Sequence, residues 1–191
     1  MSNYSATITA SSDDAREVSG TVTLTTATIT FQANTHYGGL RFTNLTIPQG
    51  STINTATLTV TVSSGTFDDP NLTIRANDID DATTFTTTAS DISGRTTTTA
   101  ATTWAASSIG VGAKTSPSIV TIIQEIIDRP GWASGNNLAL ILKGNNSDPF
   151  RYNAFDNGSA DYATLDIDYT ATSGGSGQPP RTIHQFRQRT P

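Results

Sequence analysis

The sequence predicts an all-β fold, an antiparallel β-sandwich of the jelly-roll type with one short α-helix at about 117–129. Apolar and polar residues alternate through many segments, as expected for strands that have one buried and one solvated face. Turn-forming residues, among them Pro48, Gly50, Asn157 and Gly158, separate these segments. Because strands do not alternate with helices along the chain, a parallel sheet with crossover helices is not expected.

Individual strands are expected where the alternation is clearest. In the segment 56–62, Leu58, Val60 and Val62 share one face, and threonines occupy the other. Threonine suits a solvated face because its branched Cβ favours strands and its hydroxyl stays in water. The segment 138–144 is apolar at nearly every position, which predicts a central strand covered on both faces. The other predicted strands are 21–31, 40–47, 72–78, 150–155 and 162–169.

One helix is expected, at about 117–129. Ser116 is positioned to cap its first turn, and Pro117 would occupy the first helical position. Pro130 would end the helix. An apolar stripe at helical spacing predicts that one face packs against a sheet. The stripe consists of Ile119, Ile122, Ile123, Ile126 and Ile127.

The segment 82–115 contains few large apolar residues and many threonines. We interpret it as long loops that are held to the sandwich by a few buried side chains. The expected anchors are Phe85, Ile92, Trp104 and Ile109.

Charge is distributed unevenly along the 191-residue chain. The net charge is −5, but Arg181, Arg187 and Arg189 add three positive charges near the C-terminus, and all 16 acidic residues precede them. The rest of the chain is therefore too acidic to be expected to bind nucleic acid, which requires clustered cations. The predicted organisation is a β-sandwich domain (1–171), a flexible Gly/Ser/Pro linker (172–180) and a basic C-terminal arm (181–191).

Several kinds of chemistry are not expected from this composition. The chain has no cysteine and only two histidines, His36 and His184, so thiolate chemistry and a zinc cluster are excluded. Neither histidine lies in a segment that would hold it for a catalytic triad, and we expect no enzymatic activity. No apolar run approaches the roughly 20 residues that cross a bilayer, and the N-terminus has no signal-like region. We therefore expect no membrane partner.

Two kinds of ligand remain open. Asp78, Asp80 and Asp81 follow a predicted strand and could bind calcium through oxygen atoms, although their spacing is not that of an EF-hand. We expect no cofactor and no metal, with calcium as the alternative. Trp104 and Tyr152 are candidates for stacking on a sugar ring of a surface glycan.

A set of motifs together resembles those of a known family. They are GLRF (39–42), IPQG (47–50), the Ile53, Ala56 and Leu58 spacing of the next strand, IIQEIIDRPGW (122–132), NNLALIL (136–142) and AFDNGSADYATLDIDY (154–169). Over about residues 15–170 the chain resembles DNRLRE-type β-sandwich modules of bacterial surface proteins and phage structural proteins. The resemblance implies adhesive, carbohydrate-binding-like or virion functions and supplies no catalytic residues.

We expect a phage virion structural protein, either a head decoration protein or a tail or fibre component, assembled in the host cytoplasm. A single domain with threonine-rich solvated faces and a separate basic arm suits a subunit that binds its neighbours. The expected partners are other virion proteins and further copies of this chain, and the resemblance suggests a trimer. The residues expected to bind partners are Arg181, Ile183, Phe186, Arg187 and Arg189.

The alternative is a secreted carbohydrate-binding or adhesive module, which would act outside the cell and could depend on calcium. Exposed aromatic rings and loop carboxylates would then form its ligand-binding face.

Overall fold

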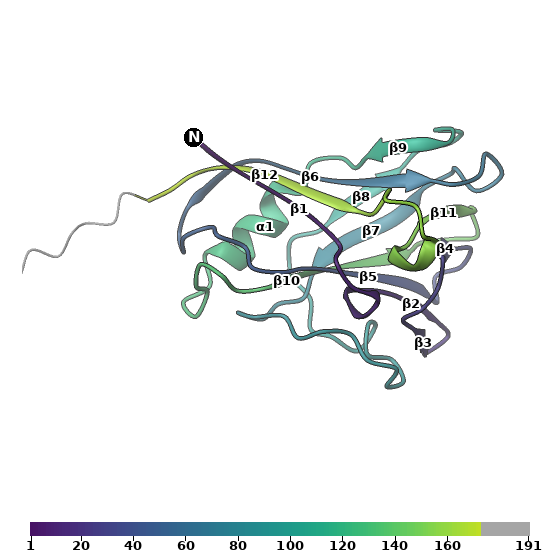
Figure 1. Ribbon diagram of the computed structural model, residues 1–191, viewed down its shortest axis with the longest axis horizontal. Coiled ribbons are helices and arrows are strands. Elements are labelled where there is room, and N and C mark those ends of the chain that lie inside the picture. Colours follow the sequence, from purple (N-terminus) through teal and green to yellow (C-terminus); the bar gives the residue numbers. More distant parts are fainter. Residues whose placement is uncertain (173–191) are drawn as a thin grey trace, which may run out of the picture.

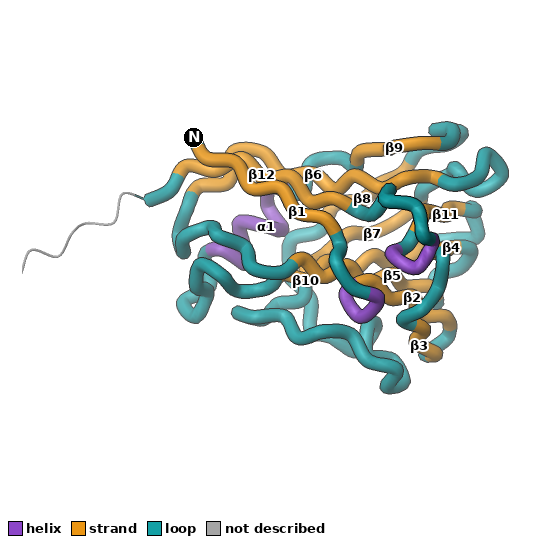
Figure 2. The backbone as a smooth tube through the Cα atoms, in the orientation of Figure 1, coloured by secondary structure: helices purple, strands orange, loops and turns teal. Residues whose placement is uncertain are grey.

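The computed structural model describes residues 1–172 as two antiparallel sheets packed face to face, as Figures 1 and 2 show. This confirms the predicted all-β sandwich. Strands that are distant in sequence pair within each sheet, as Greek-key connections require: β12 lies between β1 and β6, and β10 lies between β5 and β7. The finer expectation of a jelly roll stays a prediction. Apart from Thr172, the predicted linker and arm lie outside the described residues.

Sheet A has the order β1-β12-β6-β11-β4, and β9 pairs with β6 outside this path. The predicted inward face of 56–62 is confirmed, because Leu58, Val60 and Val62 are all buried, and Leu58 lies opposite the buried Leu165. The strands of sheet A are β1 (Ser2–Thr7), β4 (Thr28–Phe31), β6 (Thr52–Val62), β9 (Gly112–Thr115), β11 (Phe150–Asn153) and β12 (Thr164–Thr170).

Sheet B has the order β3-β2-β5-β10-β7-β8. The central position of β10 confirms the prediction from its continuous apolar sequence: Leu140 and Leu142 face the main core, whereas Ala139 and Ile141 join a smaller apolar cluster on the outer face. The strands of sheet B are β2 (Asp14–Val18), β3 (Thr21–Thr23), β5 (His36–Phe42), β7 (Asn71–Ala76), β8 (Thr102–Ala105) and β10 (Leu138–Gly144).

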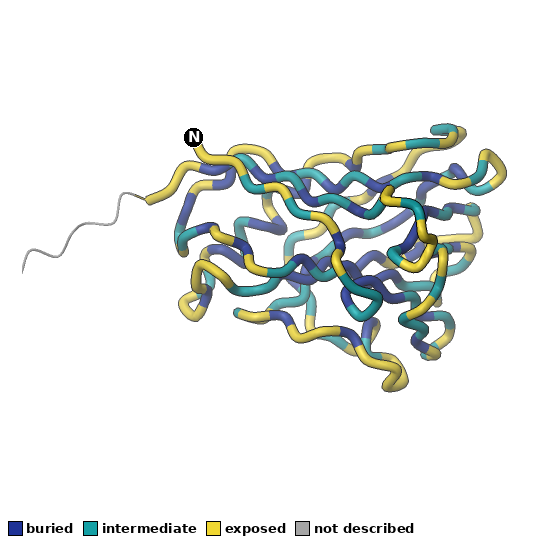
Figure 3. The backbone as a smooth tube through the Cα atoms, in the orientation of Figure 1, coloured by how far each residue is buried: buried dark blue, intermediate teal, exposed yellow. Residues whose placement is uncertain are grey.

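The long connection between β7 and β8 covers part of the outer face of sheet B. Figure 3 shows that much of the backbone of this sheet's central strands is buried, and buried apolar clusters lie on both of its faces. Phe85 and Ile92 of the connection are buried in the smaller cluster and Trp104 is buried in the main core, so these three predicted anchors are confirmed. Ile109 is only partly buried against the main core. The remaining members of the smaller cluster are Ala15, Val22, Ala82, Ala139 and Ile141.

The helix is shorter than predicted. It is α1 (Val120–Ile127), and it packs against β6 and β7 with its isoleucine stripe buried, as expected. The predicted cap was wrong: the residue at the N-cap position is Ile119, and the hydroxyl of Ser116 instead accepts a hydrogen bond from the Leu58 amide at 3.1 Å. Two short 3-10 helices, η1 (Ser11–Asp13) and η2 (Phe155–Asn157), complete the helical elements of the described chain.

Two predicted strands require correction. The segment 21–31 forms two strands in different sheets, β3 and β4, because the chain turns between them and crosses from one layer to the other. The strand predicted at 40–47 ends at Phe42, because Asn44 adopts a positive φ of 57° that no strand continues. The strands β1, β2, β8 and β9 were not predicted.

Candidate functional site

The outer face of sheet B carries a cross-strand arrangement of polar side chains beside the covering loop. Tyr37 of β5 pairs with Lys143 of β10, which pairs with Thr73 of β7. Two residues along, Ile141 pairs with Arg75. Because side chains alternate along a strand, Lys143, Thr73 and Arg75 therefore project from the same face.

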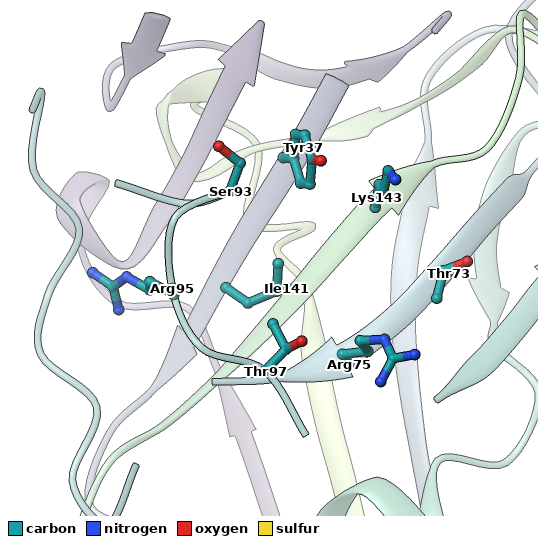
Figure 4. A pocket seen from close by; sticks show the side chains of 8 residues that line it. All are labelled: Tyr37, Thr73, Arg75, Ser93, Arg95, Thr97, Ile141 and Lys143. Carbon is teal, nitrogen blue, oxygen red and sulfur yellow. The ribbon is translucent and has the colours of Figure 1, made fainter. Parts of the chain in front are cut away.

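These side chains line a cavity of about 200 Å³. Figure 4 shows them around Ile141, with Lys143, Thr73 and Arg75 along one side and Ser93 and Arg95 along the other. A second cavity of about 290 Å³ shares the lining residues Tyr37 and Ser93 with the first, and the two adjoining cavities are together called here the outer groove. The other residues of the second cavity are Glu17, Ser19, Gly20, Asn34, Thr35 and Ser90.

Arg75 is held in place by the backbone of the covering loop. Its Nη1 donates to the carbonyl oxygens of Thr98 and Thr99, the latter at 2.8 Å. Within residues 1–172, its Nε and Nη2 have no hydrogen-bond partner, and it forms no ion pair. The guanidinium therefore presents its other edge, which carries two parallel N–H groups, without a bound carboxylate.

Lys143 is the second cation of the outer groove. It is exposed, and among residues 1–172 its ammonium group has no ion pair and no hydrogen bond. Lys143 and Arg75 lie on adjacent strands as diagonal neighbours two residues apart, a spacing of about 7–8 Å along the sheet. Two cations without a counterion therefore lie on the same face of adjacent strands, in a sandwich with twice as many acidic as basic residues.

Arg95 also lines the groove but has a structural role. Its guanidinium lies 4.2 Å from the centre of the Phe85 ring and donates to the carbonyl oxygens of Thr83 and Thr84. It also forms an ion pair with Asp91. Because these contacts occupy the guanidinium, Arg95 fixes the covering loop and is not available as a further cation.

Glu17 fastens the same loop to β2. The Ile92 and Ser93 amides donate to its Oε2 at 3.0 and 2.8 Å, and the Ser93 hydroxyl donates to its Oε1. The residue is buried, so these hydrogen bonds satisfy a carboxylate that is otherwise removed from water. The wall of the outer groove is therefore set by Glu17 and Arg95.

The two aromatic residues predicted as glycan contacts lie elsewhere. Trp104 is 4% exposed and Tyr152 is 0% exposed, and both belong to the main core, where each packs against Phe150. Burial, followed by the charge of Asp14, raises the pKa of Tyr152 well above its ordinary value. Neither ring offers a face to a surface sugar, so the interpretation of Trp104 and Tyr152 as stacking platforms was wrong.

The loop carboxylates that could bind calcium have protein partners. Arg129 donates to both Asp78 and Asp80, and Asp81 accepts from the amide and the side chain of Asn137. Within residues 1–172 there is no group of three or more His, Asp or Glu side chains arranged to hold a metal ion. These carboxylates fix the ends of loops around α1 and β10.

The remaining candidates are not brought together. His36 is the first residue of β5, and its Nδ1 lies 3.1 Å from the Thr30 carbonyl oxygen. The residues predicted to bind partners, Arg181, Ile183, Phe186, Arg187 and Arg189, lie outside the described residues, as does His184. No helix of the described chain is long and apolar enough to span a membrane.

Comparison with known proteins adds no assignment. No family model matches the chain, and no curated protein matches it. The resemblance to DNRLRE-type modules therefore stays a prediction.

Proposed function

We propose that the protein is a structural component of a phage virion, a head decoration protein or a tail or fibre component, displayed on the particle surface and held by its C-terminal arm. The observation that carries the proposal is the separation of two ends. In Figure 1 the C-terminal end of β12 lies at the left of the sandwich, whereas the β2–β3 hairpin, whose Ser19 and Gly20 line the outer groove, lies at the right. Attachment through residues beyond β12 would leave the β2–β3 hairpin, and with it this part of the groove, at the end away from the point of attachment.

The chemistry of the arm supports attachment to another protein. Arg181, Arg187 and Arg189 can form bidentate hydrogen bonds with carboxylates, and Ile183 and Phe186 can fill apolar pockets. The first partners would be other virion proteins, assembled with this one in the host cytoplasm. Further copies of this chain would be a second kind of partner, for example in a trimer. A second copy of this chain would offer complementary charge to these arginines, because residues 1–180 contain all 16 acidic residues.

Deletion of residues 173–191 tests this proposal. The sandwich should keep its melting temperature, because Thr172 and every described hydrogen bond remain, while incorporation into phage particles should be lost. A second variant, in which Arg181, Arg187 and Arg189 are replaced by glutamine, should reduce incorporation and leave the chain length unchanged. Lys114→Gln, a charge change at a half-buried position on β9, is the control. Normal incorporation of both tail variants would overturn the role of the arm.

A second candidate is a secreted carbohydrate-binding or adhesive module, and the outer groove favours it. The groove combines an aromatic residue, hydroxyl groups and two cations without counterions, as ligand sites with a few convergent polar groups do. Fractionation distinguishes the two functions: a virion component co-sediments with purified particles, whereas a secreted module is recovered free in the medium. Glycan binding before and after treatment with a calcium chelator tests the calcium-dependent version.

A further inference from the structure

We propose that the outer groove binds an acidic glycan, a saccharide chain that bears carboxylate or sulfate groups. Arg75 and Lys143 would hold the anionic group, and Tyr37 with the neighbouring hydroxyls would hold the sugar rings. The inference concerns residues 1–172 only and is independent of whether the protein is part of a particle.

The anion-binding half of the groove is arranged before any ligand arrives. Because the Thr98 and Thr99 carbonyl oxygens hold Nη1 of Arg75, the Nε and Nη2 edge is fixed in a position where it can donate hydrogen bonds to two oxygen atoms of one carboxylate or sulfate. Fixing the fork in advance reduces the conformational entropy lost on binding. Lys143, as the diagonal neighbour on the adjacent strand, adds a second positive charge to the same groove, which favours an anionic ligand there.

The saccharide-binding half lies on the other side of Tyr37. Tyr37 belongs to both cavities and is only half-buried, and its hydroxyl has no hydrogen-bond partner among residues 1–172. Apart from Glu17, whose oxygens are bound by Ile92 and Ser93, the second cavity is lined by uncharged residues. A chain that places a charged sugar beside Arg75 would therefore place a neighbouring sugar against Tyr37 and neutral polar groups.

The position of the groove argues against a peptide ligand. Extended peptides bind by adding a strand to the edge of a sheet, where backbone N–H and C=O groups are free. The groove lies over β5, β10 and β7, and the backbone groups of β10 are paired on both sides. The groove therefore offers side chains only, which suits a ligand recognised through hydroxyl and acidic groups.

Nucleic acid is also disfavoured. The groove has two free cations and one aromatic residue, whereas binding of a nucleic acid backbone depends on neutralising many phosphates. The 16 acidic residues of the sandwich, against eight basic ones, would repel a long polyanion. A short acidic segment within a largely neutral polysaccharide needs few cations and would be repelled less by the acidic sandwich.

Calorimetry of the full chain with tetragalacturonate, and with its neutral methyl ester, tests the inference. We expect the carboxylate form to bind and the methyl ester to bind at least tenfold more weakly, with affinity falling as salt is raised. Lys143→Gln should weaken binding at least fivefold. Arg75→Lys should do the same although it keeps the charge, because lysine cannot present two parallel donors. Lys114→Gln should bind as the unchanged chain does, because Lys114 lies on β9 in the other sheet.

The outcomes separate the alternatives. The inference would be overturned if neither tetragalacturonate nor dextran sulfate, the sulfated probe, bound to the chain. It would also be overturned if Lys114→Gln lost as much affinity as Lys143→Gln. Equal affinity for a short polyglutamate peptide would overturn the choice of a glycan. Thermal unfolding checks whether Arg75→Lys has loosened the loop. If it has, Lys143→Gln decides the result, because that change removes no described hydrogen bond. Tyr37→Ala should weaken the methyl ester and the acid alike, because the ring contacts the sugar and not its charge.

Discussion

The ring of Phe85 lies directly over Gly39, so closely that a Cβ atom on this glycine would be 2.4 Å from Cζ of Phe85. Gly38 faces the opposite side of sheet B, where a Cβ would be 2.9 Å from Cζ of Phe31. Two consecutive glycines on β5 thus admit one aromatic ring on each face of the sheet. This pair allows the covering loop to approach sheet B and the main core to pack beneath it.

Replacement of Gly39 by alanine should therefore destabilise the fold. The added methyl group would displace the buried Phe85 ring and disturb the cation–π contact with Arg95, at a cost of about 1–3 kcal/mol, typical of overpacking. Urea unfolding measures the effect. Gly65→Ala is the control, because a Cβ there would have no atom within 4 Å. Equal stabilities of the two variants would contradict the close packing of Phe85 on Gly39.

Replacement of Glu17 by alanine should release the covering loop. The change leaves the amides of Ile92 and Ser93 without their acceptor, and an unsatisfied buried amide costs about 1–3 kcal/mol. We expect faster hydrogen exchange at these two amides and earlier proteolytic cleavage within the loop, while the amides of β6 and β12 keep their protection. Unchanged exchange at Ile92 would show that Glu17 does not fasten the loop.

Ser116 distinguishes the role predicted from the sequence from the role in the structure. Since its hydroxyl accepts from the buried Leu58 amide, Ser116→Ala should destabilise the protein by about 1–3 kcal/mol and increase hydrogen exchange at Leu58. Ser118→Ala, at an exposed position whose hydroxyl lies 3.4 Å from the Val120 amide, should cost less. If Ser116→Ala increased hydrogen exchange at the amides of α1 but not at the Leu58 amide, Ser116 would instead cap the helix, as the sequence predicted.

The sequence predicted those strands whose alternation follows from burial on one face. In β6 and β12, and in the continuously apolar β10, local pattern and tertiary position agree. The strand β1, with the sequence SNYSAT, pairs at the edge of sheet A and is mostly exposed, so no apolar period marks it. The same holds for β9 (GAKT), where pairing with β6 and not burial defines the strand.

The outer groove could not be predicted because it depends on register. Tyr37, Thr73, Arg75 and Lys143 come from three strands, and only the pairing of β10 with β5 and β7 places them together. One local signal was available: in 138–144 the face that carries Ala139 and Ile141 ends in Lys143, a charge at the end of an apolar row. Conversely, Trp104 and Tyr152 were chosen by residue type alone, and aromatic residues in a sandwich of this size mostly fill its core.

Asp14 is the buried acid with the clearest effect on pH dependence. Its Oδ2 accepts from the Phe155 amide at 3.0 Å, whereas its Oδ1 is buried without a partner among residues 1–172. Burial, with smaller contributions from the charges of Asp156 and Asp13, raises the pKa of Asp14 to about 7 from its ordinary value of 3.8. The folded protein therefore binds this proton more tightly than the unfolded chain does.

It follows that the contribution of Asp14 to the free energy of unfolding is fully present below pH 3.8 and is lost as the pH rises through about 7. The total loss over this range is on the order of 4 kcal/mol. Asp14→Asn, which imitates the protonated acid, should remove this dependence. The variant should match the unchanged protein near pH 4 and exceed it in stability at pH 8, as measured by urea unfolding across this range. Parallel stability curves for the two proteins would mean that Asp14 ionises in the folded protein as readily as in the unfolded chain, and that its carboxylate has access to water.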